Sequence, residues 1–347
     1  MPDMTTALVT GGSGYFGTVL VHKLLERGYA VRVFDLHKPE SLRAALQFHE
    51  GDIRDTSAVL AACQNMDLVF HNVAQVPLAK DSKLFWSVNR DGTRNLLNAC
   101  MAQKVRKVIY TSSSAIYGIP RNNPVTEETQ PSPGEDYGRA KLAGETLCKE
   151  SVSQGLDVSI VRPRTILGHG RLGLFQILFE WIYQGKNIPV LDGGKNIYQF
   201  VHADDLADAC VLAGEKPGAQ DFNCGANSFG TMREALENLC RHAGTGSRMK
   251  SLPMWLMEPA MNVSSALGVS PLGAYHSLMY GRSMYFDVSK AMKQLNWTPR
   301  YSNDAMFTES YEWYVKNREQ VLKARSDASR HQSPVKQGIL AVLQKFL

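Results

Sequence analysis

The amino-acid sequence predicts an α/β fold, a doubly wound parallel sheet with a smaller C-terminal lobe interleaved with it. Three observations predict this fold. Short apolar runs alternate with helical stretches through the first half of the 347-residue chain, and the first run leads into a glycine-rich turn. After about Arg164 the alternation becomes irregular, with loops rich in Gly, Pro and Asn. Alternating strands and helices are typical of βαβ units and therefore of a parallel sheet.

The N-terminal segment predicts a strand, a turn and a helix. The apolar run Ala7–Thr10 leads into three glycines at three-residue intervals, and a helical pattern follows until Gly28. Gly11 turns the chain, Gly14 lets the backbone approach a pyrophosphate, and Gly17 lets the helix pack against the strand. Free N–H groups at the helix N-terminus then face the phosphates. The flanking elements favour a Rossmann-type dinucleotide site over a tight turn without a ligand.

Acidic residues follow the next two predicted strands. The strand Ala30–Phe34 ends in Asp35, where a carboxylate meets the adenosine ribose hydroxyls of a dinucleotide. Because a carboxylate repels a 2′-phosphate, Asp35 favours NAD and makes NADP the lesser candidate, although three basic residues follow within 37–43. A third element ends near Asp52 and Ile53, which are candidates to grip the adenine. A plain surface turn is the equal alternative for this pair.

Further elements continue the alternation to the middle of the chain. Strand-like runs at Leu68–His71, Lys107–Thr111 and Val158–Val161 alternate with helical stretches near Ser82–Gln103 and Tyr137–Gln154. In open α/β sheets, ligands bind at the carboxyl ends of the strands. We therefore expect the functional residues where these strands end.

We predict three parts of the chain. Residues 1–165 form the dinucleotide-binding domain with returning segments near 196–225, residues 166–322 form the interleaved substrate-binding lobe, and residues 323–347 form a polar linker and an amphipathic tail.

One face of the tail carries Ile339, Leu340, Leu343, Phe346 and Leu347. Docking onto the body or onto a second subunit is the first interpretation of this tail. Weak attachment to a membrane surface is the second.

Composition and charge argue against several function classes. The six cysteines have no metal-ligand spacing, which favours buried free thiols in a reducing compartment over zinc or disulfides. The net charge of +5 comes without a dense basic stripe, so we expect no nucleic-acid partner. We find no signal peptide before the first strand and no transmembrane segment in the sequence, and therefore expect a cytoplasmic protein.

Tyr137 and Lys141 are the most informative pair of side chains. Their spacing places a phenol and an ammonium on one helix face. A phenol has a pKa of about 10, so action as a base near neutrality needs a lowering of roughly 3 units, which a buried ammonium would supply. A solvated surface pair is the alternative. Several hydroxyls, among them Ser112, Ser113 and Ser114, follow the strand Lys107–Thr111, and a serine there can hydrogen-bond the same substrate oxygen. Alternatively, these hydroxyls only cap the strand end.

With these residues in view, the sequence resembles the NAD-dependent epimerase/dehydratase family of the extended short-chain dehydrogenase/reductase superfamily. The matching segments, in family order over about the first two thirds of the chain, are Thr10–Gly17, Asp35, Gly51–Ile53, His71–Ala74, Asn89 with Gly92-Thr93, Thr111–Gly118, Tyr137–Lys141, Arg162-Pro163 and Phe200–Asp205. The resemblance implies that Tyr137 is the general acid or base, that Lys141 is its partner and also bonds the nicotinamide ribose, and that Ser113 holds the reacting oxygen. The expected NAD-binding residues are Gly11, Ser13, Gly14, Tyr15, Phe16, Gly17, Asp35, Asp52, Ile53, Val73, Ala74, Gln75, Ser112, Tyr137, Lys141 and Pro163.

The implied chemistry is hydride transfer between a secondary alcohol carbon and the nicotinamide. Reduction of the resulting ketone on its other face gives epimerisation, whereas release of the ketone gives dehydrogenation. Dehydratases of the family carry an acidic pair just after the active-site hydroxyl, where this chain has Ser114 and Ala115, so sugar dehydration is disfavoured. Family members often dimerise through the Tyr–Lys helix and the one before it, here around Leu84–Met101 and Leu142–Val152, so we expect a homodimer.

The substrate class is open between two readings. Sugar-nucleotide members carry an Asn and two Arg that hold the diphosphate. This chain has Thr165 at the position of the Asn, and either Ile197 or Tyr198 at the position of the first Arg. The segments 194–196 and 282–287 look instead like the hydroxysteroid and sterol-carboxylate dehydrogenase branch. We place a nucleotide-sugar epimerase first, a 3β-hydroxysteroid, sterol-like or other alcohol dehydrogenase second, and a non-catalytic NAD-binding protein third. The candidate substrate residues are Ser114, Thr165, Arg164, Arg171, Tyr198 and Arg282.

Overall fold

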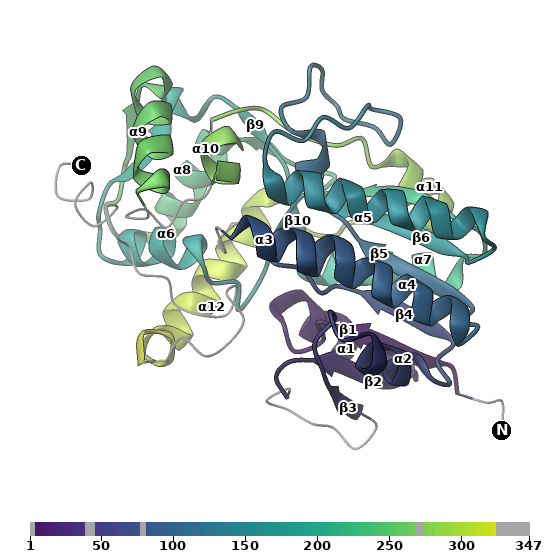
Figure 1. Ribbon diagram of the computed structural model, residues 1–347. Helices are drawn as coiled ribbons and strands as arrows, with labels where there is room; N and C mark the ends of the chain where they lie inside the picture. The colour runs from purple at the N-terminus through teal and green to yellow at the C-terminus, as the bar shows by residue number, and fades with distance from the viewer. Residues whose placement is uncertain (1–3, 39–45, 77–80, 268–273, 280, 324–347) are drawn as a thin grey trace.

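Figure 1 shows the computed structural model, which describes residues 4–38, 46–76, 81–267, 274–279 and 281–323. A seven-stranded sheet with the order β11-β6-β5-β4-β1-β2-β3 lies at its centre, and all its neighbouring strands are parallel. The strands are β1 (Thr6–Thr10), β2 (Ala30–Asp35), β3 (Leu46–Glu50), β4 (Leu68–His71), β5 (Lys107–Thr111), β6 (Val158–Pro163) and β11 (Asp221–Cys224). The chain order reverses between β1 and β4, which opens a crevice at their carboxyl ends. The predicted doubly wound α/β fold is confirmed.

Helices cover both faces of the sheet, because successive residues of each strand point to opposite sides. Ala7 and Val9 lie in one hydrophobic core, with α1 (Tyr15–Glu26), α7 (Ala203–Glu215) and α11 (Ser289–Leu295), whereas Leu8 lies in the other. This second core is completed by α2 (Thr56–Cys63), α4 (Thr93–Ala102) and α5 (Asp136–Ser153). Figure 1 shows α4 and α5 side by side along one face of the sheet.

The stretch expected as one helix over Ser82–Gln103 has three parts. A short α3 (Ser82–Leu84) leads into a π-helical segment, Phe85–Gly92, and α4 follows without a break in the chain. Within the π-helical segment Asn89 accepts the Gln75 N–H at 2.7 Å and donates to the Gln75 carbonyl at 3.0 Å. Such π segments are frequent at functional sites, and this one fixes the loop that follows β4.

A second group of helices and short strands encloses its own aromatic core. Phe179, Phe200 and Phe307 pack there, with Phe200 and Phe307 edge to face at 5.0 Å between ring centroids. The helices of this lobe are α6 (Leu174–Tyr183), α8 (Met232–Ala243), α9 (Met254–Ala266), α10 (Ala274–Met279) and α12 (Asn303–Lys323). Its strands are β7 (Thr165–Leu167), β8 (Ile188–Leu191), β9 (Ile197–Tyr198), β10 (Phe200–His202), β12 (Gly230–Thr231) and β13 (Met249–Leu252). In the predicted returning segment near 196–225, α7 packs on the central sheet and β11 is one of its strands. The predicted domain boundaries stay a prediction.

All six cysteines are buried and carry free thiols, with the Sγ atoms of Cys63 and Cys100 4.0 Å apart. Within the described part of the chain, none of the helices combines the length and the apolar character that a bilayer crossing requires. The predictions for the linker and the amphipathic tail concern residues after Lys323, which lie outside the described residues.

Candidate active site

The glycine turn between β1 and α1 has the geometry of a phosphate-binding loop. Gly11 has φ of +71°, and a side chain on Gly17 would come within 2.0 Å of the Gly11 carbonyl oxygen. Gly14 immediately precedes the first turn of α1 and donates its N–H to Gly11 at 3.1 Å. The side chains of Tyr15 and Phe16 are buried, so these residues offer a ligand mainly their backbone N–H groups.

Asp35 closes this turn from the end of β2. Its carboxylate accepts the Ser13 N–H at 3.1 Å, and burial raises the pKa of the carboxyl while that hydrogen bond lowers it. The carboxylate therefore lies beside the glycine turn, as a ribose-binding residue must. Asp52 is held instead by Arg54, whose guanidinium lowers the Asp52 pKa, and Ile53 is only 3% exposed, within the core beneath α2 and α4.

The floor of the crevice is formed by the ends of β1, β4 and β5. His71 is buried with its ring nitrogens 2.7 Å from the Thr10 hydroxyl and 3.0 Å from the Thr93 hydroxyl, and burial lowers its pKa to about 3, so it is neutral. Val73 lies against Gly11, because a side chain at position 11 would meet the Val73 backbone at 3.0 Å. Val73 therefore lines the turn, and the NAD contacts of Val73, Ala74 and Gln75 stay predictions.

Tyr137 and Lys141 lie on the first turns of α5, which Glu135 caps. The Glu135 carboxylate accepts the N–H groups of Tyr137 and Gly138, both at 2.7 Å. Both functional side chains are buried, at 8% exposure for Tyr137 and 2% for Lys141. The Lys141 ammonium donates to the Thr111 carbonyl at 2.7 Å and lies 4.9 Å from the centroid of the Tyr110 ring. Phe85 supports the Tyr137 ring edge-on at 6.0 Å.

The pKa of Tyr137 differs from the sequence expectation. Burial raises it to about 12, opposed by a hydrogen bond with Ser113 and by the charge of Arg171. The expectation that a buried ammonium brings this pKa towards neutrality is wrong for this structure, because desolvation outweighs the positive charges. Burial also lowers the pKa of Lys141 to about 8. The phenol is therefore protonated at neutral pH, and the Lys141 ammonium on the same helix is close to losing its proton.

Ser113 is the hydroxyl that meets Tyr137. It precedes a 3₁₀ turn, Ser114–Tyr117, where its Oγ accepts the Ala115 N–H at 3.1 Å while the side chain bonds Tyr137. The neighbouring Ser114 accepts a hydrogen bond from Arg164 at 2.8 Å. Ser112 is buried, and its Oγ has no hydrogen-bond partner among the described residues. Of the three serines, Ser113 is therefore the one placed to hold a substrate oxygen with Tyr137.

Comparison with known proteins identifies the family to which this arrangement belongs. The model of the NAD dependent epimerase/dehydratase family matches residues 7–225, which include the glycine turn, Ser113, Tyr137 and Lys141. The chain belongs to the NAD-dependent epimerase/dehydratase family. It is an enzyme of the extended short-chain dehydrogenase type, and its cofactor is NAD.

Relatives of this epimerase/dehydratase chain include several kinds of protein. It is 58% identical to a Sinorhizobium fredii protein named "Uncharacterized protein y4nG", over 97% of this chain and 85% of the relative. It is 29% identical to a 3 beta-hydroxysteroid dehydrogenase/Delta 5-->4-isomerase of Mycobacterium tuberculosis, over 96% of each chain. Among solved structures, a UDP-glucose 4-epimerase from Thermotoga maritima with UDP-glucose has a TM-score of 0.75 and 26% identity, covering 90% of this chain and 99% of that one.

The residues of the crevice fit the cofactor of the family. Gly14 and the N-terminus of α1 would form the cradle for a pyrophosphate, and Asp35, beside the glycine turn, would bind the ribose hydroxyls. Buried hydroxyls of Tyr15 and Ser112 have no hydrogen-bond partner among the described residues. Lys141 and Tyr137 would hold the nicotinamide end, and Pro163 ends the neighbouring strand β6. These individual NAD contacts stay predictions.

The candidate substrate residues of this epimerase/dehydratase chain separate into two groups. Arg282 forms a two-pronged ion pair with Glu258, both contacts at 2.9 Å, so its charge is already compensated. Arg164 is 1% exposed, stacks over the Tyr198 ring at 4.7 Å, and has no hydrogen-bond partner for Nε and Nη2 among the described residues. Thr165 and Tyr198 share a hydrogen bond of 2.8 Å beside it.

Arg171 is another of the six candidates, and the structure brings it to the catalytic crevice. Its guanidinium carbon lies 5.3 Å from the centroid of the Tyr15 ring, and its charge lowers the pKa of Tyr137. The Nε and Nη1 atoms are buried without a hydrogen-bond partner among the described residues. Arg164 and Arg171 therefore both keep unused donors.

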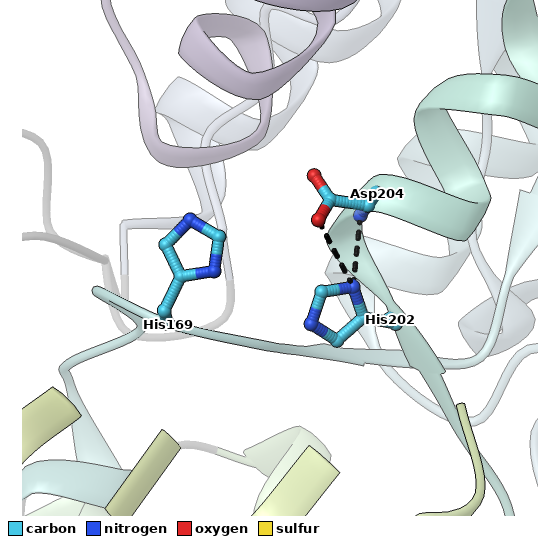
Figure 2. A group of neighbouring side chains, drawn as sticks. All are labelled: His169, His202 and Asp204. Atoms are coloured by element: carbon cyan, nitrogen blue, oxygen red, sulfur yellow. Dashed lines mark hydrogen bonds and ion pairs between the residues drawn. The ribbon is translucent and has the colours of Figure 1, made fainter. Parts of the chain in front are cut away.

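Sequence reasoning missed a histidine and carboxylate cluster next to the crevice. Figure 2 shows His202 and Asp204 facing each other, with His169 beside them on a separate loop. One ligand atom from each of the three lies within 4.8 Å of the others. Glu309 joins them from α12, at 3.0 Å from His169 Nδ1 and 3.3 Å from His202 Nε2. His202 Nδ1 accepts the Asp204 N–H at 3.1 Å and so caps α7, which accounts for part of the cluster structurally.

Glu135 was also missed. The sequence offered little signal, since Glu is not among the preferred N-cap residues, and the neighbouring Asp136 is the more usual type. No local signal identifies the cluster around His202, because Glu309 is 140 residues from His169.

Proposed function

We propose that this enzyme is a nucleotide-sugar epimerase, which oxidises a secondary alcohol of the sugar and reduces the resulting ketone on its opposite face. The hydrogen bond between the buried Tyr137 and Ser113, at the carboxyl end of β5, carries the proposal. It gives one substrate oxygen both a proton acceptor and a second hydrogen-bonding group. Bound NAD supplies the hydride acceptor.

The chain's own residues handle the proton and the orientation of the substrate. During oxidation the phenolate form of Tyr137, a minor fraction at neutral pH because burial raises the pKa to about 12, accepts the hydroxyl proton at Oη while Ser113 Oγ bonds the same oxygen. Because burial holds the Tyr137 pKa at about 12, the phenol keeps that proton and returns it when the ketone is reduced. Lys141 is fixed by the Thr111 carbonyl at 2.7 Å, so its ammonium stays directed at the nicotinamide side of the crevice.

The preference for a nucleotide sugar rests on charge. Arg164 is a deeply buried cation with unused donors next to Ser114, and such a group suits an anionic ligand better than an apolar one. The solved relative that carries UDP-glucose supports the same class. The sequence analysis offered Arg282 as a residue that binds the substrate, but its guanidinium is already paired with the Glu258 carboxylate.

Incubation with UDP-glucose and, separately, UDP-galactose tests the proposal. The NAD-loaded wild-type enzyme is expected to convert each into the other, with no net formation of NADH, and chromatography would quantify both. Tyr137→Phe should lose about 10²- to 10⁴-fold in rate, since it lacks the proton-transferring hydroxyl. Failure to interconvert these or other sugar nucleotides, such as UDP-glucuronic acid, would contradict the proposal.

A 3β-hydroxysteroid or sterol-like alcohol dehydrogenase is the second candidate. The 29% identity to a 3β-hydroxysteroid dehydrogenase over 96% of both chains favours it. So does α9, on which Trp255, Leu256 and Val263 are exposed apolar side chains. This reading predicts net NADH formation from an apolar alcohol such as a 3β-hydroxysterol. The third expectation from the sequence, a non-catalytic NAD-binding protein, is set aside because the chain belongs to an enzyme family.

Further proposals concern the assembly and its location. A homodimer would form through α4 and α5, the helices that lie side by side along one sheet face in Figure 1. Light scattering after size-exclusion chromatography would show twice the chain mass of 38.5 kDa, and a monomer would contradict the proposal. A cytoplasmic location agrees with six free thiols.

A further inference from the structure

Helix α9 and the residue after it carry the two most exposed large apolar side chains in the described part of the chain. Trp255 is 78% exposed and Leu267 71%, and Leu256 and Val263 are exposed as well. The Leu267 N–H donates to the Val263 carbonyl at 2.9 Å, so the helical hydrogen bonding extends to Leu267. Leu256, Val263 and Leu267 are spaced by seven and four residues and therefore share one helix side, with Trp255 at its edge. These four side chains form the apolar face of α9.

The other side of α9 is already occupied. Met261 and Ser264 are buried, and α10 packs against this helix. Leu278 of α10 in turn lies against Gly134, three residues before Tyr137, so α9 and α10 adjoin the segment that leads into the catalytic helix. A contiguous apolar patch on a packed helix is typical of a surface that contacts a further segment or molecule. We therefore expect a partner for the apolar face of α9.

A segment near the end of the sequence has the complementary pattern. Its apolar residues share one helix side, and they are Ile339, Leu340, Leu343, Phe346 and Leu347. On the same helical spacing Ala341 and Lys345 fall on the opposite side. This segment lies outside the described residues. Its pattern predicts a short helix with one side that must be covered, which is also what the apolar face of α9 requires.

The chain between α12 and this segment is long enough to reach α9. The 15 residues of 324–338 follow Lys323, the last residue of α12, and span up to roughly 50 Å when extended. The distance to cover lies within one lobe, since α12 packs on α8, α8 packs on β13, and β13 ends two residues before α9 begins. Figure 1 shows α8, α9 and α12 in the same part of the molecule. Residues 324–338 are mostly polar, as suits a solvated tether.

We propose that residues 339–347 dock as an amphipathic helix on the apolar face of α9 of the same chain. A tether of this length keeps the segment at about millimolar concentration near α9, far above the concentration of a second copy in solution. A membrane surface suits α9 less well, because interfacial helices carry Lys or Arg on their polar side and α9 has neither. Its one charged side chain, Glu258, is already paired with Arg282. The proposal does not depend on which alcohol the enzyme oxidises.

Hydrogen exchange read by mass spectrometry tests the proposal on the 347-residue chain. The tail variant, which combines Leu340→Ser, Leu343→Ser and Phe346→Ser, removes the apolar side of the segment. Ala341→Ser combined with Lys345→Ser is its matched control on the opposite side. For a tether concentration of about 1 mM and a dissociation constant of about 0.1 mM, α9 is uncovered roughly a tenth of the time. We therefore expect the amides of 254–267 to exchange about tenfold faster in the tail variant and at the wild-type rate in the control.

A substitution on α9 tests the same contact from the other side. Val263→Ser should speed the exchange of 339–347, whereas Leu322→Ser, at a 46% exposed side chain of α12, should leave it unchanged. Both substitutions replace exposed side chains, so the hydrophobic cores stay intact and the exchange rates report on the contact rather than on global unfolding.

Three results would overturn the proposal. The first is exchange of 254–267 at the same rate in wild type and the tail variant. The second is protection of α9 that disappears on dilution, which would assign its apolar face to a second copy. The third is protection that arises only when vesicles of phosphatidylcholine and phosphatidylglycerol are added, which would assign the face to a membrane surface. Because no turnover is measured, each result leaves the epimerase assay as a separate test of the proposed function.

Discussion

Replacing Lys141 by Met tests how strongly burial acts on the active-site ammonium. The side chain is 2% exposed, and burial lowers its pKa from 10.5 to about 8 in spite of the hydrogen bond to Thr111. At about 1.4 kcal/mol per pKa unit, this shift means that the charged Lys141 side chain lowers the unfolding free energy of the wild type by about 3 kcal/mol. Because the folded pKa lies below the unfolded value, the unfolded chain binds more protons in this window. The Lys141 contribution to wild-type stability therefore rises as the pH increases from 8 to 10.5.

Denaturant unfolding of wild type and Lys141→Met, below pH 8 and near pH 10.5, measures this contribution. The variant lacks the titrating group, so its unfolding free energy does not gain the increase that the wild type gains. The unfolding free energy of the variant minus that of the wild type should therefore be about 3 kcal/mol lower near pH 10.5 than below pH 8. Lys149→Met, which changes a 63% exposed lysine on the same helix, should show no comparable change. A stability difference between Lys141→Met and wild type that is the same at both pH values would refute the reasoning.

Two other substitutions test the ion pair that fixes α5 and the effect of its N-terminal carboxylate on the Tyr137 pKa. Arg162→Met leaves the Glu145 carboxylate buried without its two-pronged partner and should lower the unfolding free energy by about 3–5 kcal/mol, and a loss below about 1 kcal/mol in denaturant unfolding would contradict this. Glu135→Gln removes a negative charge that raises the Tyr137 pKa, so the limb of the pH–rate profile on which alcohol oxidation rises with pH should move to lower pH. Asp136→Asn, at an exposed neighbour, should leave the profile in place. An unchanged Glu135→Gln profile would show that the carboxylate acts only as a helix cap.

Sequence patterns located the elements of the sheet because those patterns are local. The apolar runs at Leu68–His71 and Lys107–Thr111 coincide with β4 and β5, and the glycine turn precedes α1 as expected. Ser113 was assigned from the family resemblance, by counting back from Tyr117-Gly118, which is also a local pattern. The π-helical segment Phe85–Gly92 was not predicted, because its register depends on the bond between Asn89 and the distant Gln75 loop.

Charge compensation could not be predicted from the sequence, because it depends on contacts between remote residues. Arg282 and Arg171 were equal candidates as arginines in loops, but Glu258 neutralises the first and no described carboxylate neutralises the second. The pKa of Tyr137 was misjudged for a related reason. The four-residue spacing to Lys141 shows that the two share a helix face, but only the structure shows how completely the phenol is buried and that the ammonium is bonded to a backbone carbonyl.

The fate of the transferred hydrogen tests the central claim most directly. The NAD-loaded enzyme would be given UDP-glucose carrying deuterium on the carbon to be inverted, and mass spectrometry would follow the label. If Tyr137 and Ser113 support oxidation followed by reduction at one site, the wild type returns the deuterium to the same carbon of the product epimer and Tyr137→Phe forms almost none of it. Deuterium that accumulates in free NADH, or an epimer formed at the same rate by Tyr137→Phe, would contradict the account.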